Sequence, residues 1–209
     1  MQYQAVVFDM DGVIFDTERL VIEFWKEVAK KHNIPNVEHT CIQCLGTNRV
    51  RTREIFLENY GADFPFDPYR AEVTELFNTH YKGVPLPTKP GVRELLSYLQ
   101  EQDIKVGLAS STAQHLVRDE IGTAGLLPYF QTLVCGDMVE HSKPAPDIFL
   151  KACEILNADP TKSIAIEDSF NGIRSAHCAG MTPIMVPDQV QPTDEIRTLA
   201  FHVMPSLLD

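Results

Sequence analysis

Four acidic residues follow short apolar runs in pairs, and this placement makes them the first candidates for chemistry. Asp9 and Asp11 are two positions apart, which puts both on the same side of an extended chain, and Gly12 then lets the backbone turn away. Glu167 and Asp168 form the second pair. Four carboxylates in one crevice would repel one another and raise their pKa values. A hard cation relieves this repulsion, and such an oxygen-rich site favours Mg²⁺ together with a substrate phosphate.

Two further polar residues, Ser110 and Lys143, also follow apolar runs. A hydroxyl and an ammonium group are suited to hold the oxygens of a phosphate. In open α/β sheets, ligands bind outside the carboxyl ends of the strands, so these residues are expected in the same crevice as the acids. Taken singly, each has a plainer interpretation: Ser110 and Ser111 would cap the helix that follows, and a lone carboxylate would be solvated. Their joint occurrence in chain order favours the shared site.

These residues need a scaffold, and the apolar runs predict a parallel β-sheet. Each run is nearly continuous instead of alternating, which is typical of strands covered on both faces. The predicted strands are Ala5–Phe8, Ile104–Ala109, Thr132–Cys135, Ser163–Ile166 and Pro183–Val186. The helical patterns between them are Val92–Glu101, Thr112–Ile121, Asp147–Leu156 and Phe170–Ala179. Strands and helices that alternate across short loops predict an α/β fold with a doubly wound, Rossmann-like parallel sheet.

A long interval separates the first predicted strand from the second. It contains helical patterns at Leu20–Lys31, Arg49–Asn59 and Tyr69–Tyr81, followed by several prolines. A structureless loop of this length is uncommon in a compact domain. We therefore predict an inserted α-helical cap domain at residues 17–86, and a catalytic core formed by residues 1–16 and 87–209.

The composition excludes several classes of function. Of the 209 residues, 44% are hydrophobic and 22% are charged, as in an ordinary globular protein. The formal net charge of −11 would repel a nucleic-acid backbone or an anionic membrane, and no apolar run reaches the roughly 20 residues that span a bilayer. We expect a small molecule as the partner, with no nucleic acid, no membrane and a monomeric state.

The cysteines favour a reduced protein. Their number, five, is odd, and their spacing is not that of a small disulfide scaffold, so we expect a cytoplasmic location. Cys41 and Cys44, with His39 nearby, have a spacing that also occurs in zinc and redox sites. A structural zinc site needs four ligands, and no second pair is visible in the sequence. Packing is the favoured interpretation of these two cysteines, and a further role stays open.

Four stretches of the chain resemble the four motifs of the haloacid dehalogenase superfamily. The stretches are Asp9–Val13, Ala109–Ser110, Ser142–Pro146 and Ile166–Ser169. The insert after the first motif is similar to the helical cap of the β-phosphoglucomutase-like subfamily. The resemblance covers essentially the whole chain. Its motifs are specific for the superfamily and much less so for the substrate.

The resemblance implies a role for each acidic residue. Asp9 would be the nucleophile that takes the phosphoryl group as an aspartyl-phosphate. Asp11 would protonate the leaving oxygen and then deprotonate the attacking water. Mg²⁺ would be held by the Asp9 carboxylate, the main-chain carbonyl of Asp11 and Asp168, with Glu167 bound directly or through water. Asp11 also argues against dehalogenation, because the dehalogenases of the superfamily lack this second aspartate.

The same resemblance implies how the phosphate is held. Ser110 and Lys143 would hold the transferring oxygens, where charge stabilisation supplies most of the catalysis. We expect the adjacent Ser111 to contact the substrate. Trp25, the single tryptophan of the sequence, either lines the cap side of the site or anchors the core of the cap.

A loop in the insert is expected to choose the substrate. Leu45–Arg49 resembles the cap loop that reaches over the site in this subfamily, so Gly46 and Arg49 are predicted to bind the substrate. Arg51 and Arg53 are better interpreted as exposed side chains of a helix.

Two departures from the resemblance separate a phosphatase from a mutase. The mutase branch carries a histidine where this chain has Val21 and a lysine where it has Leu45. Both changes disfavour a mutase, which must hold a bisphosphate in either orientation. The favoured function is therefore a Mg²⁺-dependent phosphatase of a small phosphorylated sugar or polyol. A sugar phosphomutase, and a non-catalytic binding or regulatory protein on the same fold, are the alternatives.

Overall fold

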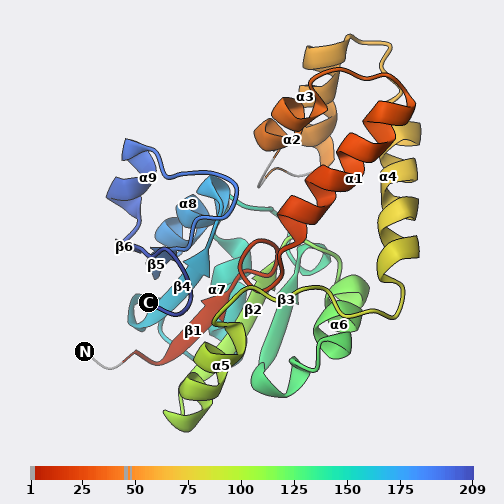
Figure 1. Cartoon of the computed structure of the whole chain (residues 1–209). Helices are drawn as coiled ribbons and strands as arrows, with labels where there is room; N and C mark the ends of the chain where they lie inside the picture. The colour runs from red at the N-terminus through yellow and green to blue at the C-terminus, as the bar shows by residue number, and fades with distance from the viewer. Residues whose placement is uncertain (1–2, 45–46, 48) are drawn as a thin grey trace.

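The structure, a computed structural model, describes residues 3–44, 47 and 49–209. Within these residues a parallel sheet has the strand order β3-β2-β1-β4-β5-β6 (Figure 1). The strands are β1 (Ala5–Phe8), β2 (Lys105–Ser110), β3 (Thr132–Cys135), β4 (Ser163–Glu167), β5 (Thr182–Met185) and β6 (His202–Val203). From β1 the chain builds β2 and β3 on one side and then β4 to β6 on the other. The predicted doubly wound, Rossmann-like sheet is confirmed, and its switch point lies at the carboxyl end of β1.

Both faces of β1 are buried, which explains its continuous apolar sequence. Val6 and Phe8 pack with α5 and α6 on one face of the sheet, whereas Ala5 and Val7 pack with α7 and α8 on the other. The helices are α5 (Val92–Glu101), α6 (Gln114–Thr123), α7 (Asp147–Leu156) and α8 (Phe170–Cys178), and α9 (Asp194–Leu199) packs against α8. Helices on both faces are what a parallel sheet requires.

Beyond the end of the sheet at which β1 terminates, the described residues form four helices that pack around an apolar core of their own (Figure 1). We call them the cap helices: α1 (Thr17–Lys31), α2 (Val37–Cys44), α3 (Arg49–Tyr60) and α4 (Phe66–Tyr81). Trp25 lies at the centre of this core, with ring centroids 4.7 Å from Phe56 and 5.0 Å from Tyr69. The domain boundaries at residues 17 and 86 stay a prediction.

The differences from the predicted elements are small and local. Helices α2 and α9 and strand β6 were not predicted, because elements of eight, six and two residues carry little periodicity. Ser169 caps α8 by accepting a hydrogen bond from the Gly172 backbone N–H. Helix α6 begins after Ala113, so the capping interpretation of Ser110 and Ser111 is wrong.

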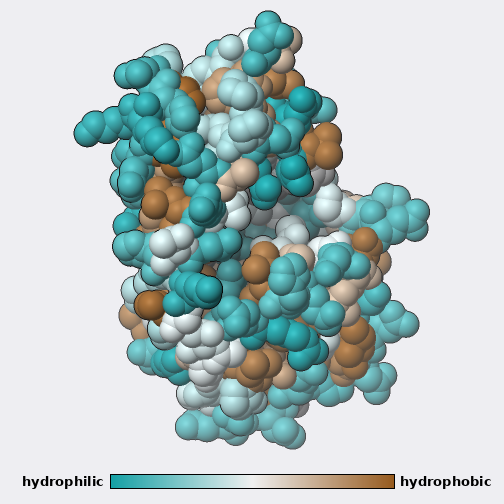
Figure 2. Space-filling view, turned by 90° about the vertical axis from the view of Figure 1, so that its right-hand side faces the viewer, coloured by the Kyte–Doolittle hydropathy of each residue, from teal (hydrophilic) through white to brown (hydrophobic). Residues whose placement is uncertain are grey.

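Figure 2 shows the surface receding between the cap helices and the sheet, with hydrophobic residues in separate patches on the face drawn. Along the described part of the chain, no helix combines the length and the apolar character that a bilayer-spanning helix needs.

Candidate active site

The buried ammonium group of Lys143 joins the carboxyl ends of three strands. Its Nζ atom donates hydrogen bonds to Asp9 Oδ1 (2.5 Å), to Glu167 Oε1 (2.7 Å) and to the carbonyl oxygen of Ala109 (2.9 Å). These partners belong to the ends of β1, β4 and β2. The ring of Phe149 lies against the same ammonium group, 5.1 Å from its centroid. Side chains that are far apart in the sequence therefore contact one another at the switch point of the sheet.

The pKa values of Lys143 and Asp9 depend on each other. Burial would lower the pKa of Lys143, but the carboxylates of Asp9 and Glu167 raise it above its ordinary value. Burial raises the pKa of Asp9 well above its ordinary value, and Lys143 opposes that rise. One ammonium group between two carboxylates leaves a negative charge uncompensated in a buried place, which favours binding of a further cation.

The carboxyl group of Asp11 is oriented by two hydroxyl groups. Thr17, the first residue of α1, donates a hydrogen bond to Oδ1 (2.7 Å), and Thr112, after β2, donates to Oδ2 (3.1 Å). Burial raises the pKa of Asp11, and the two hydroxyl donors oppose the rise. The two hydroxyls therefore fix the orientation of the Asp11 carboxyl group. Because its pKa is raised, this group holds a proton more readily than an exposed aspartate does.

Asp168 has the features of a metal ligand. Its Oδ2 atom is buried and has no hydrogen-bond partner among the described residues. Gly12, with φ of +82°, lies so close that a Cβ atom there would be 2.2 Å from this oxygen. Asp9, Glu167 and Asp168 each offer a carboxylate oxygen, and these oxygens lie within 4.8 Å of one another. A buried all-oxygen set with an unsatisfied member fits Mg²⁺.

Glu167 is already held through both of its oxygens. Besides the bond from Lys143 to Oε1, its Oε2 atom accepts hydrogen bonds from the backbone N–H groups of Asp168 (3.1 Å) and Ser169 (3.2 Å) and from the Ser169 hydroxyl (3.0 Å). Gly172 in α8 permits this packing, because a Cβ atom there would lie 1.8 Å from the Glu167 carboxyl. Glu167 is therefore suited to position Lys143 as well as to contact a cation.

A second group of carboxylates adjoins the first through Asp168. Glu18, Asp168 and Asp188 each have a buried oxygen without a partner among the described residues, and oxygens of the three lie within 4.8 Å of one another. Lys89 compensates one of them through an ion pair with Asp188 (2.6 Å). Burial raises the pKa of Glu18 to about 8. Glu18 and Asp188 were not predicted from the sequence, although Asp188 closely follows a predicted strand, the same signal that marks the other acids.

The two serines that were predicted to contact the substrate, Ser110 and Ser111, differ in burial. Ser110 is buried at the end of β2, and its hydroxyl oxygen accepts a hydrogen bond from the Thr112 backbone N–H (3.1 Å). Ser111 is exposed and is not among the residues that line the cavity described below. Gly46 lies outside the described residues.

The predicted cap residues are also placed differently from one another. Trp25 both anchors the core of the cap and lines the cavity, so its two interpretations are compatible. The side chain of Arg49 is 65% exposed and forms an ion pair with Asp67 (2.8 Å). It does not line the cavity. Cys41 and Cys44 pack in the cap core as free thiols, and burial raises the pKa of Cys44 to about 12.

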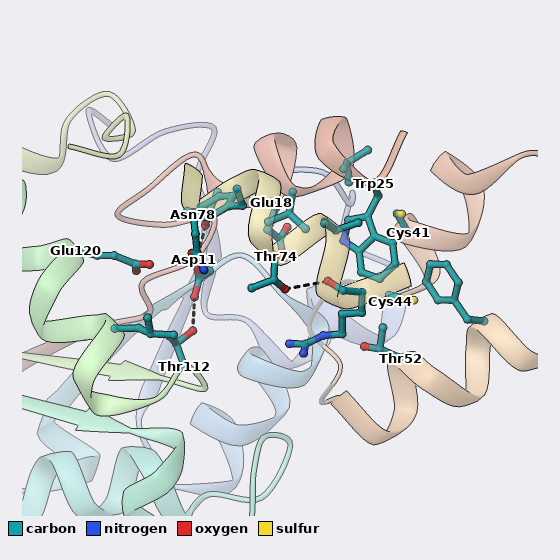
Figure 3. Close-up of a pocket in the computed structure, with 18 residues that line it drawn as sticks. Asp11, Glu18, Trp25, Cys41, Cys44, Thr52, Thr74, Asn78, Thr112 and Glu120 are labelled. Atoms are coloured by element: carbon teal, nitrogen blue, oxygen red, sulfur yellow. Dashed lines mark hydrogen bonds between the residues drawn. The ribbon is translucent and has the colours of Figure 1, made fainter. Parts of the chain in front are cut away.

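A cavity of about 380 Å³ lies between the cap helices and the sheet. Figure 3 shows Asp11, Thr112 and Glu120 at one end of it, and Trp25, Cys41, Cys44 and Thr52 at the other. Asp11 therefore faces the space in which a substrate would lie. Burial, and to a smaller extent the negative charges of the nearby Asp11 and Asp119, raises the pKa of Glu120 to about 7. Glu120 and Arg70, which also lines this cavity, were not found from the sequence because each lies on a helix without a local motif.

The chain is similar to known hydrolases and mutases over most of its length. Residues 6–186 match the family described as haloacid dehalogenase-like hydrolase. The chain is 34% identical over 181 residues to a phosphorylated carbohydrates phosphatase of Thermotoga maritima, covering 87% of this chain and 83% of that protein. It is 34% identical over 199 residues to β-phosphoglucomutase of Bacillus subtilis, covering 90% and 85%. The crystal structure of β-phosphoglucomutase from Clostridium difficile is similar with a TM-score of 0.76 and 25% identity, covering 99% and 92% of the two chains.

Proposed function

The chain belongs to the haloacid dehalogenase-like hydrolase family, and from this premise we propose that it is a Mg²⁺-dependent phosphatase of small phosphorylated sugars or polyols, acting through Asp9. The observation that carries the proposal is the contact of Asp9 with the buried Lys143 at the end of β1, with Asp11 beside it facing the cavity. A buried nucleophile paired with a cation, next to a carboxyl group that can carry a proton, supports phosphoryl transfer.

The proposed reaction has two steps. A carboxylate oxygen of Asp9 attacks the phosphorus atom and forms an aspartyl-phosphate, while the bond to the leaving alcohol breaks and Asp11 gives its proton to that oxygen. A water molecule then attacks the phosphorus atom, Asp11 takes a proton from it, and the Asp9 carboxylate is released with inorganic phosphate. Lys143 compensates negative charge on the transferring oxygens, and the Ser110 hydroxyl donates a hydrogen bond to them.

Asp9, Asp168 and the main-chain carbonyl of Asp11 would hold Mg²⁺, with Glu167 nearby. When bound, the cation supplies positive charge to the phosphoryl oxygens. The carboxylates keep their arrangement through Lys143 and through the backbone donors to Glu167, so the protein positions its own ligands.

Two observations support a phosphatase of carbohydrates over a mutase. Relatives carry the names phosphorylated carbohydrates phosphatase, fructose-1-phosphate phosphatase and hexitol phosphatase. Val21, which stands where the mutase branch has a histidine, lines the cavity with an apolar side chain. The free thiols fit the cytoplasmic location proposed for this activity.

The test is a panel of sugar, polyol and glycolate phosphates, assayed for release of inorganic phosphate with Mg²⁺ and with a chelator. We expect release that depends on Mg²⁺, and a hydroxylamine-sensitive acyl phosphate on the protein during turnover. Interconversion of hexose phosphates without net release of phosphate would identify a mutase instead. Absence of turnover on every ester, including an aryl phosphate, would identify a non-catalytic protein.

A further inference from the structure

The cavity wall contains one basic residue among those that the structure describes, Arg70 in α4. Asp11, Glu18 and Glu120, which line the same cavity, are acidic. Arg70 is half-buried, and no described carboxylate forms an ion pair or a hydrogen bond with its guanidinium group. A partly desolvated cation without a partner is unfavourable, and a bound anion would remove that cost.

The neighbouring arginines in the cap differ from Arg70. Arg49 pairs with Asp67, Arg53 lies 3.6 Å from the same carboxylate, and all three side chains of these pairs are at least half exposed. Burial lowers the pKa of Arg70 and the charge of Arg49 lowers it further, while Asp67 opposes this to a smaller extent. Asp67 is thus shared by two other guanidinium groups, and positive charge is left in excess at Arg70.

The position of Arg70 sets which part of a ligand it can reach. The reacting phosphoryl group belongs with Asp9 and Lys143 in the sheet domain, whereas Arg70 is carried by a cap helix on the opposite side of the cavity. A guanidinium group offers donors only, in a planar fork that matches two oxygens of a carboxylate or phosphate. A hydroxyl group would satisfy one donor and leave the charge uncompensated.

We propose that Arg70 binds an anionic group at the end of the substrate remote from the reacting phosphate, so that the preferred substrates are phosphate esters carrying a second carboxylate or phosphate. This inference rests on the proposed phosphatase function and narrows its substrate class. Apolar side chains such as Val21, Val73 and Leu116 also line the cavity, where they would contact the carbon skeleton without compensating either charge. Arg70 acts as a specificity-determining residue.

The experiment compares substrates that share a carbon chain. Sorbitol-6-phosphate and 6-phosphogluconate differ at the remote end by a hydroxymethyl group against a carboxylate, and fructose-1,6-bisphosphate offers a second phosphate there. We expect wild-type kcat/KM to be roughly 10–100-fold higher for at least one anionic substrate than for sorbitol-6-phosphate, the effect of one charged hydrogen-bonding contact. The two anionic substrates distinguish a carboxylate from a phosphate as the remote group.

Arg70→Met should abolish this advantage, mainly by raising KM, and leave sorbitol-6-phosphate and acetyl phosphate near their wild-type values. Arg70→Lys should restore part of it, because the charge remains and the fork is lost. Arg53→Met, an exposed arginine that does not line the cavity, is the matched control and should behave as wild type. Thermal unfolding of each variant checks that the cap is folded.

Three results would overturn the inference: no wild-type advantage for either anionic substrate, equal losses on all substrates in Arg70→Met, or loss of the advantage in Arg49→Met with retention in Arg70→Met. The last result would assign the remote anion to Arg49. In each case the wild-type protein still hydrolyses acetyl phosphate, so the proposed phosphatase function survives. Failure to hydrolyse acetyl phosphate with Mg²⁺ would reject that function itself and the inference with it.

Discussion

The two ends of the cavity differ in how their charged groups are satisfied. At the end near the sheet, Asp11 lines the cavity and is held by two hydroxyl groups, and Lys143, beside this end, is enclosed by carboxylates. At the cap end, no described carboxylate forms an ion pair or a hydrogen bond with Arg70, and most of the cap side chains that line the cavity are apolar. Under the proposed assignments, the groups that take part in the chemistry are preorganised by the protein, whereas the group that recognises the substrate is left to be satisfied by the substrate.

The difference also follows from what supports each end. Asp9 directly follows β1, a strand buried on both faces, and the ammonium group of Lys143 is held by its contacts with the ends of β1, β2 and β4. The cap end is built by helices that pack around a separate core, so its wall can change without disturbing the strands. We expect substitutions at the sheet end to change the rate of the chemical steps, and substitutions in the cap to change the choice of substrate.

Asp9→Asn is expected to have the largest effect. The amide cannot form a stable aspartyl-phosphate, so turnover and the hydroxylamine-sensitive acyl phosphate should both disappear. The measurement is phosphate release together with acyl-phosphate trapping, with thermal unfolding as the control for folding. Retention of more than a few per cent of the wild-type turnover would reject the covalent mechanism.

Asp11→Asn should lower turnover by about 10²–10⁴-fold, the usual contribution of general acid–base catalysis. Its affinity for Mg²⁺ should change little, because the proposed contact is made by the main-chain carbonyl. Turnover is measured by phosphate release, and affinity by calorimetric titration of the protein with Mg²⁺. A large loss of affinity would show that the side chain of Asp11 binds the metal, contrary to our assignment.

Much of the sheet end was predictable because its signals are local. A short apolar run followed by an acid marks the end of a buried strand, and parallel strands bring such ends together, so Asp9, Asp11 and Asp168 could be grouped before any contact was known. The same rule points to Asp188, which lies two residues after the predicted strand Pro183–Val186.

The cap end could not be predicted in the same way. Arg70 and Glu120 lie on α4 and α6, and neither is distinguished by its neighbours in the sequence. Their common cavity is a product of how the cap helices pack over the sheet. Arg49 was predicted to bind the substrate because it belongs to the stretch Leu45–Arg49 that resembles a cap loop, but its side chain is exposed and pairs with Asp67. Local motifs identify chemistry better than they identify the shape of a pocket.

Glu18→Gln tests whether a residue of the cap helices supports the proposed Mg²⁺ site at the sheet end of the cavity. Glu18 belongs to α1 and has a buried oxygen without a partner among the described residues, and its carboxylate offers an oxygen within 4.8 Å of those of Asp168 and Asp188. A carboxylate that supports a metal site from outside the ligand set typically changes affinity by about 10–100-fold, so we expect a loss of Mg²⁺ affinity within that range. Calorimetric titration without substrate measures it. Glu27→Gln, an exposed residue of the same helix, is the control. Unchanged affinity would leave Glu18 a residue of the cavity wall alone.

Glu120→Gln should have the smallest effect of the four substitutions. It is expected to change the pH dependence of the free energy of unfolding. Burial and then Asp11 and Asp119 raise the pKa of Glu120 to about 7, with Glu18 and Arg70 on the other walls of the cavity. Because its pKa is raised from 4.5, the folded state binds the proton more tightly than the unfolded state. Stability is therefore lost as the pH rises from about 4.5 to about 7, and stays reduced above that.

The amide of Glu120→Gln cannot ionise, so the variant should match the wild type in acid and exceed its Tm by about 2–4 °C at alkaline pH, for roughly 1 kcal/mol after allowance for partial exposure. Scanning calorimetry across the pH range measures the difference. Glu154→Gln, on an exposed position of α7 across the sheet, should show no such pH-dependent gain. A variant that is less stable than wild type at alkaline pH would mean that the ionised Glu120 has a favourable partner, and the cavity wall would then be preorganised like the sheet end.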